Sequence, residues 1–199
     1  MRPGTGFYAG WPGIRSAGQY LNTFPTLQTV PVDGAFTLSA WINPRDISQV
    51  HTIISQVGGQ LDAGEFALRV HGGGYLQLYR RPSQSNESVD VVQSAAIIPL
   101  NQWTHVVAVY GSSGGGGNLR LYVNGELVAE DVFLSAYAPT SPRPDTDLNM
   151  TRIGASELTS EGNRRYPFNG SIDEVMIFDR ALSSDEIRAM YQNFTQYRP

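Results

Sequence analysis

The side chains that could do chemistry in this chain come from a restricted set. All 14 basic residues are arginine, because the 199 residues include no lysine, and there is no cysteine either. The missing cysteine excludes disulfides, thiolate nucleophiles and zinc–thiolate sites, and the missing lysine excludes Schiff-base catalysis and the phosphate-binding lysine of P-loops. The three histidines, His51, His71 and His105, lack the spacing of a helical zinc pair. Carboxylates, guanidinium groups, hydroxyls and aromatic rings therefore remain as the groups that could bind a ligand.

Short apolar segments, separated by clusters of Gly, Pro, Asn and Ser, must position these groups. Their spacing is typical of an all-β sandwich or barrel. In FTLSAWI, residues 36–42, Phe36 and every second residue after it are apolar and point the same way, which predicts a strand with one dominant buried face. We expect strands over residues 36–43, 51–57, 65–71, 75–80, 89–94, 103–110, 119–123, 127–133, 150–153 and 170–178.

Local signals predict several connections and one helix. Asn124 and Gly125 between two alternating apolar runs predict a two-residue hairpin, since both central residues need positive φ. The three glycines at 72–74 predict a second, looser hairpin, and the glycine-rich segment 112–118 is typical of a flexible linker between adjacent strands. Ser183, with Glu186 three residues later, forms a capping-box pattern at the start of one short amphipathic helix.

Charge and hydropathy restrict the partners. The net charge is −4 at pH 7 and the isoelectric point is about 5.3, so the basic footprint of a nucleic-acid-binding protein is missing. No apolar run approaches the ~18 residues needed to span a bilayer, and residues 1–16 lack the apolar segment of a signal peptide. We expect no nucleic-acid partner, no membrane insertion, no signal peptide in this chain, an N-terminal arm over residues 1–17 and one domain over 18–199.

The C-terminal stretch FNGSIDEVMIFDRALSSDEI, residues 168–187, carries a family pattern. It resembles the laminin-G-like, concanavalin A-like jelly-roll domains, whose last core strand and helix read F-x-G-x-I-D-E-V-x-I-Y-x-R-A-L-S-x-x-E-I. Further pieces agree in the family's order: FTLSAWI at 36–42, QWTHVVAVY at 102–110, LYVNG at 121–125 and RIG at 152–154. The resemblance covers roughly residues 18–193. It implies an antiparallel β-sandwich, a jelly roll of two sheets packed face to face, with one short C-terminal helix.

The resemblance implies binding more than catalysis. Related jelly-roll glucanases carry E-x-D-x-x-E on one strand, with two carboxylates facing the substrate. None of the eight glutamates here has an aspartate two residues on, and the adjacent Asp173 and Glu174 would face opposite ways on a strand. We therefore predict that the chain is not an enzyme.

Calcium is the cofactor that the resemblance makes most plausible. In several relatives a carboxylate on the last long strand joins backbone carbonyls of the N-terminal region in a structural calcium site, and Asp173 occupies that position by motif. Hard oxygen ligands of this kind suit Ca²⁺; the alternative is that Asp173 accepts hydrogen bonds from loop amides. A weaker calcium candidate is Asp145, Asp147 and Asn149, where the D-x-D-x-N start lacks the glycine and the bidentate glutamate of a full calcium loop.

Aromatic and arginine residues outside the core pattern are candidates for a ligand surface. Sugar sites need aromatic rings to stack on apolar sugar faces, with a few placed polar groups. Arginine beside tyrosine suits carboxylated or sulfated glycans, because the guanidinium fork binds oxyanions in bidentate fashion; the alternative is ordinary solvated loops and strand edges. The candidates are Trp11 in the arm, Tyr79, Arg80 and Arg81 at a strand end, Tyr137 in a long loop, and Arg164, Arg165 and Tyr166.

Three functions remain open at the level of sequence. The first is a non-catalytic carbohydrate-binding or adhesion module; the second is a structural or assembly protein, such as a virion decoration protein or a surface-filament subunit. The third is an accessory domain of a larger hydrolase. The expected partner is a glycan or another protein surface, including a second copy of the chain, and the expected location is extracellular or on a cell or virion surface.

Overall fold

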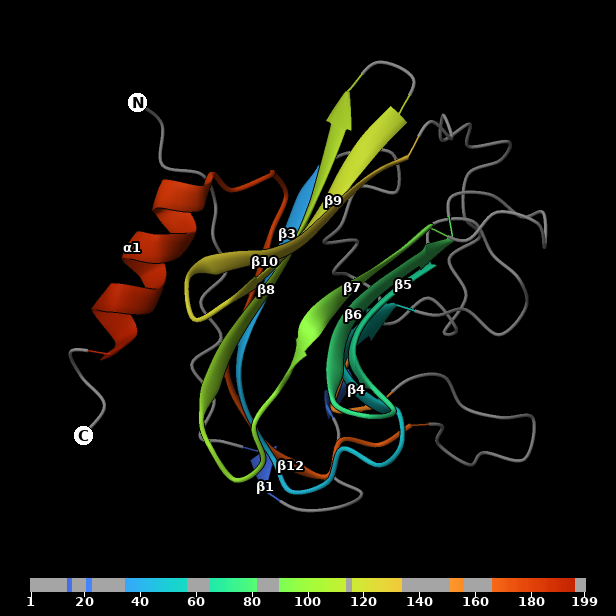
Figure 1. Cartoon of the computed structure of the whole chain (residues 1–199), viewed down its shortest axis with the longest axis vertical. Coiled ribbons are helices and arrows are strands. Elements are labelled where there is room, and N and C mark those ends of the chain that lie inside the picture. Colours follow the sequence, from blue (N-terminus) through green and yellow to red (C-terminus); the bar gives the residue numbers. More distant parts are fainter. Residues whose placement is uncertain are drawn as a thin grey trace.

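The computed structural model describes residues 14–15, 21–22, 35–56, 65–81, 90–113, 116–133, 151–155 and 166–195. These residues form two six-stranded antiparallel sheets that face each other, as the jelly-roll prediction required (Figure 1). In spatial order, sheet A consists of β1 (Ile14–Arg15), β12 (Gly170–Phe178), β3 (Phe36–Pro44), β8 (Thr104–Ser113), β9 (Gly116–Val123) and β10 (Glu126–Phe133). Sheet B consists of β2 (Leu21–Asn22), β11 (Thr151–Ile153), β4 (His51–Gln56), β5 (Glu65–His71), β6 (Tyr75–Arg81) and β7 (Asp90–Ile97).

All ten strands predicted from apolar spacing are present, with ends that differ by three residues at most. The short strands β1 and β2 were not predicted. Strand β1 falls inside the expected arm of residues 1–17, where it pairs with β12 in antiparallel register. Part of that arm is therefore an edge strand of sheet A.

The core lies between the two sheets. Alternate residues of each strand point inward, and their side chains are excluded from water, as with Leu38 of β3, Leu68 of β5, Leu78 of β6 and Leu121 of β9, all 0% exposed. Burial of apolar surface from both sheets supplies the main favourable term for folding. Because successive side chains of a strand point to opposite faces, the residues between these buried ones lie on the outer faces of the sheets.

The outer face of sheet A is covered by the helix α1 (Ser184–Thr195) (Figure 1). Ile187 is fully buried in a second apolar cluster with Val107 of β8 and Tyr122 of β9. We predicted one dominant buried face for residues 36–42, and this was wrong: Ser39 and Trp41, on the side away from the core, are 0% and 4% exposed. The reason is that sheet A is packed on one side against sheet B and on the other against its own helix.

The start of α1 confirms the predicted capping box. The backbone N–H of Ser183 donates to Oε2 of Glu186 at 2.8 Å, and the backbone N–H of Glu186 donates to Oγ of Ser183 at 3.3 Å. The same carboxylate accepts two hydrogen bonds from Arg180, at 2.7 and 3.1 Å. Arg180 and the Ser183 amide together lower the pKa of Glu186 to about 2.

Glycine explains two of the connections. Asn124 and Gly125 have φ values of 52° and 83°, which confirms the predicted two-residue hairpin. The segment 112–118 was predicted as a flexible linker, but its residues 112–113 and 116–118 extend β8 and β9: Ser112 pairs with Gly117, and Gly111 pairs with Asn118. A Cβ at Gly117 would meet the ring of Tyr110, so the glycine there allows a close approach between that ring and β9.

Candidate functional site

A row of polar side chains crosses three neighbouring strands on the outer face of sheet B. Arg69 of β5 lies opposite Gln77 of β6, which in turn lies opposite Gln93 of β7. Nε of Arg69 donates to Oε1 of Gln77 at 2.7 Å, and Nε2 of Gln77 donates to Oε1 of Gln93 at 2.8 Å. These residues alternate with the inward-facing Leu68 and Leu78, so the row faces away from the core. We call Arg69, Gln77 and Gln93 the polar row.

The guanidinium of Arg69 is the charged end of the polar row. It lies 5.3 Å from the ring centroid of Tyr79, within the range of a cation–π interaction. Arg69 is half-buried, and burial lowers its pKa, while the nearby phenol groups of Tyr79 and Tyr166 partly offset that effect. Within the described part of the chain, no carboxylate pairs with Arg69, and its two terminal nitrogens have no hydrogen-bond acceptor.

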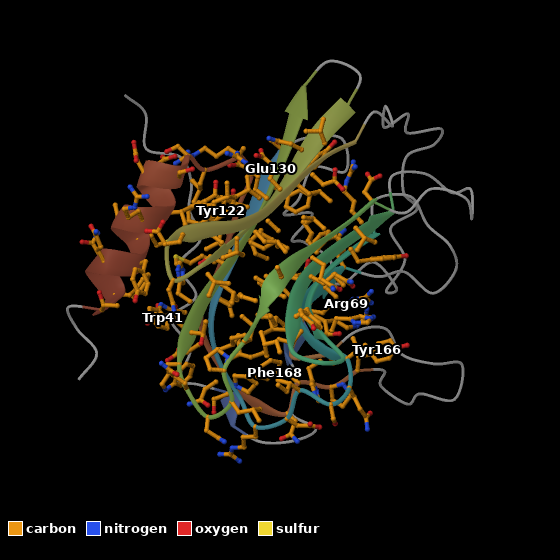
Figure 2. The ribbon with its side chains drawn as sticks, viewed as in Figure 1. Trp41, Arg69, Tyr122, Glu130, Tyr166 and Phe168 are labelled. Carbon is orange, nitrogen blue, oxygen red and sulfur yellow. The ribbon has the colours of Figure 1, made fainter. Side chains whose placement is uncertain are left out.

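Tyr166 reaches this face from a different part of the chain. It lies shortly before β12 in the chain and beside β4, where its carbonyl oxygen accepts a hydrogen bond from the backbone N–H of Thr52 at 2.9 Å. Its φ of 54° is in the left-handed region, and its side chain is 43% exposed. Figure 2 shows Arg69 and Tyr166 on the same side of the sandwich, away from α1. Two predicted ligand candidates, Tyr79 and Tyr166, are thus brought together around an arginine that was not predicted.

Arg80 occupies the opposite face of the same sheet. Its side chain is directed between the sheets, where it is 2% exposed and lies over the ring of Tyr110 at 3.9 Å. Nη1 donates to Oδ2 of Asp90 at 3.1 Å, and burial raises the pKa of that aspartate despite the arginine beside it. The prediction of Arg80 as a surface ligand residue is therefore corrected: strand alternation places it in the core, as part of a buried ion pair.

The remaining ligand candidates are not placed by the structure. For Arg81 the structure gives only its backbone, paired with Glu65 at the end of β6. The other candidates lie outside the described residues, and they are Trp11, Tyr137, Arg164 and Arg165.

Asp173, the predicted calcium ligand, lies in β12 at a β-bulge. Its register partner is Trp41, and the irregularity spans Asp173 to Met176. Oδ1 of Asp173 accepts a hydrogen bond from the backbone N–H of Glu174 at 2.9 Å, and Glu174 has a left-handed φ of 49°. One carboxylate oxygen therefore accepts the amide of the next residue, and calcium binding at Asp173 stays a prediction.

The donor set for a metal at Asp173 is only partly visible. Strand β1 runs beside β12 and pairs with Ile172 and Ser171, so the N-terminal region adjoins the strand of Asp173. The carbonyl donors expected from residues 1–13 lie outside the described residues, as do Asp145, Asp147 and Asn149. Among the residues that are described, no three His, Asp or Glu side chains gather as metal ligands do.

His105 has a structural role in the packing of sheet A. It is 0% exposed beneath α1, with Nε2 at 2.9 Å from Oγ of Ser39 and its ring stacked near Tyr191. Burial lowers its pKa to about 4, so the ring is neutral at physiological pH. His105 therefore belongs to the packing of the helix rather than to a ligand surface.

The sequence matches a known protein family. A family model described as the concanavalin A-like lectin/glucanases superfamily matches residues 15–188. The chain belongs to this superfamily. Human adhesion G-protein coupled receptor D1 is 30% identical over 144 residues, which are 72% of this chain and 14% of the receptor. The chain thus spans about one seventh of that relative, and the activity of the whole receptor is not transferred to it.

Solved structures show the same fold at low identity. The CBM40 module of the Ruminococcus gnavus IT-sialidase, bound to α2,3-sialyllactose, matches with a TM-score of 0.61 and 19% identity over 79% of this chain and 82% of that one. A mutant NanB sialidase from Streptococcus pneumoniae matches with a TM-score of 0.69 and 18% identity over 92% of this chain and 27% of the sialidase. The first of these structures, by its description, is a carbohydrate-binding module bound to a sugar.

The only helix in the described residues, α1, is 12 residues long and cannot cross a bilayer.

Proposed function

We propose that this chain is a non-catalytic carbohydrate-binding module whose ligand lies on the outer face of sheet B. The observation that supports this is the polar row of Arg69, Gln77 and Gln93, flanked by the rings of Tyr79 and Tyr166. Sugars are held by aromatic rings together with a few oriented polar groups, and this face offers both.

The arrangement of the sandwich favours this face over the other. The outer face of sheet A is occupied by α1, with Ile187 fully buried against it. The outer face of sheet B carries polar side chains in a fixed hydrogen-bonded order. The likeness to a CBM40 module bound to sialyllactose adds support, since it shows that a superfamily fold of this kind holds a sugar.

A glycan array with the purified chain tests the proposal, followed by titration calorimetry on the best ligand. We expect Tyr79→Ala to weaken binding about tenfold, because a stacked ring contributes roughly 1 kcal/mol or more. The matched control is Arg188→Ala on α1, a helix that lies on the side of the sandwich away from sheet B (Figure 1). The Arg188 guanidinium lies beside Glu126 of β10. Binding to no glycan on the array would contradict the proposal.

A second candidate function is assembly through protein contacts. Strand β10 lies at the edge of sheet A as described, and its Leu127 and Val132 are 48% and 66% exposed. Edge strands with exposed apolar side chains are sites of strand addition. Light scattering over a range of concentrations tests this, and a Val132→Lys variant should abolish any oligomer that forms through β10. The location outside cells and the role as an accessory hydrolase domain stay predictions.

A further inference from the structure

We propose that Arg69 makes this face specific for acidic sugars, by binding a carboxylate or sulfate group of the glycan. This rests on the proposed function, and it names the class of ligand and the residue that selects it. A guanidinium has five N–H donors in a planar fork. Only Nε–H is used, in the hydrogen bond to Gln77, so the four N–H groups of the two terminal nitrogens have no acceptor among the described residues.

The partner of Arg69 keeps the positive charge available. Gln77 is 6% exposed and neutral, so its amide oxygen orients the guanidinium without cancelling its charge. Gln93 orients Gln77 in turn, because it accepts the Nε2–H of Gln77 and leaves Oε1 of Gln77 facing Arg69. The two amides thus orient the guanidinium through its Nε–H and leave its two terminal nitrogens for a ligand.

No carboxylate of the described residues balances Arg69, and this has an energetic meaning. A half-buried cation loses part of its hydration, and without an anion that loss is not offset. The lowered pKa of Arg69 reflects the same desolvation. An acidic ligand would supply the missing anion, and a bidentate contact to an arginine is among the stronger hydrogen-bonded contacts in proteins.

The aromatic rings complete a site for a sugar rather than for a bare anion. The ring of Tyr79 lies 5.3 Å from the guanidinium carbon, and the Tyr166 side chain is 43% exposed beside it. A sugar bound by its acidic group at Arg69 would bring its apolar face against one of these rings. The chain as a whole carries a charge of −4, so attraction of an anion depends on this local cation rather than on the overall field.

The experiment compares matched probes on the full chain by titration calorimetry. The carboxylate probe is α2,3-sialyllactose, the neutral probes are its methyl ester and lactose, and a sulfated lactose tests the other anion. We expect an acidic probe to bind at least about tenfold more tightly than the neutral probes, since hydrogen bonds to charged groups contribute roughly 1.5–3 kcal/mol. The carboxylate and sulfate arms show which acidic group is preferred.

Variants assign the effect to Arg69. Arg69→Gln should lower affinity for the acidic probe about tenfold or more and leave any binding of the neutral probes within about twofold. Gln77→Glu should have a similar effect, because a glutamate there would pair with Arg69 and occupy its charge. Arg188→Gln removes the same charge from α1, and its affinity should stay within about twofold of the unmodified chain.

The outcomes separate the two proposals. Equal affinity for the sialylated probe, its ester and lactose would overturn the selection of acidic sugars and leave the carbohydrate-binding function standing, and this comparison needs no variant. Selective binding of acidic probes that Arg69→Gln leaves unchanged in a folded protein would overturn the assignment to Arg69. Binding of no glycan at all would overturn both proposals.

Discussion

Sheet B carries an arginine beside a tyrosine ring on each of its faces, and the two arginines differ in how their charge is balanced. On the inner face, Arg80 pairs with the carboxylate of Asp90 at 3.1 Å, and both side chains are 3% exposed. On the outer face, Arg69 is half-buried and donates at 2.7 Å to the neutral amide of Gln77. The charge of Arg80 is balanced by a carboxylate inside the fold, whereas the charge of Arg69 is held by a neutral amide at the surface.

This difference separates a structural role from a binding role. A buried cation requires an anion from its own chain, since removal of one partner leaves an uncompensated charge in the core. A cation at a surface can be held by neutral groups, because water or a ligand completes its shell. Helix α1 packs on the outer face of sheet A. The outer face of sheet B is therefore the better candidate for binding a ligand.

The largest effect is expected from breaking the inner pair. Asp90→Ala should lower the free energy of unfolding by about 3–5 kcal/mol, because Arg80 would remain buried without its carboxylate. Urea unfolding followed by tryptophan fluorescence measures this change. A loss below about 1 kcal/mol would mean that water or another group already balances Arg80, and the contrast between the faces would fail.

A double variant provides the control for the inner pair. Burial raises the pKa of Asp90 even though Arg80 is adjacent, which indicates that desolvation of the pair is costly. Arg80→Leu together with Asp90→Leu should therefore be about as stable as the unmodified chain, since no buried charge is left over.

The covered face of sheet A gives the next largest effect, as a dependence on pH. Burial lowers the pKa of His105 from its ordinary 6.5 to about 4. The unfolded chain therefore takes up a proton at a higher pH than the folded chain, and stability falls as pH drops from about 6.5 to about 4. The full loss is on the order of 3 kcal/mol for a shift of this size.

Chemical unfolding at several pH values tests this, with His105→Gln as the control. Glutamine does not titrate and can still bond to Ser39, so the variant should lose much of the slope between pH 6.5 and 4. An unchanged slope would show that carboxylates, and not this buried ring, govern acid sensitivity.

The fold and two of the three residues of the polar row could be predicted from sequence, for reasons visible in particular residues. The glycines at 72–74 predicted a hairpin, and a hairpin centred on Gly73 places Arg69 opposite Gln77. Strand alternation then puts both on the face opposite Leu68. The sequence therefore contained the signal for pairing Arg69 with Gln77. The arginines predicted as ligand candidates were instead those in consecutive pairs, at a strand end and in a loop.

Other features depended on long-range contacts that a local pattern does not contain. Gln93 is the direct partner of Gln77, and the register of β6 and β7 shifts between Tyr75 and Gln77, which no local pattern indicates. The burial of Arg80 follows from alternation. Its partner Asp90 lies on the next strand, β7, and no local pattern indicates that pairing. The second buried face of β3 required that α1 fold back on sheet A, which the capping box alone could not indicate.

Calcium bound at Asp173, in sheet A, should stabilise the fold without affecting either face of sheet B. A structural site with Kd of roughly 10⁻⁴–10⁻³ M would add about 1 kcal/mol in ~2 mM calcium. We expect a rise of a few degrees in Tm against EDTA, and no rise in Asp173→Asn. The affinity for acidic probes should be the same with and without EDTA if the metal only stiffens the fold. An equal Tm in both buffers would contradict the calcium site and leave Asp173 with a structural role, such as accepting the Glu174 amide.

The smallest change in stability is expected from replacing Arg69, and it tests most directly whether Arg69 and Arg80 differ in role. Arg69→Gln removes a charge that no described carboxylate balances, and a glutamine there can still bond to Gln77. The free energy of unfolding should change by about 0.5 kcal/mol or less, as for other surface substitutions, against several kcal/mol for Asp90→Ala. Urea unfolding of the two variants side by side measures the contrast. A loss above about 2 kcal/mol in Arg69→Gln would make Arg69 part of the structural framework, as Arg80 is, because a residue kept for an external anion should cost the free protein almost nothing when it is replaced.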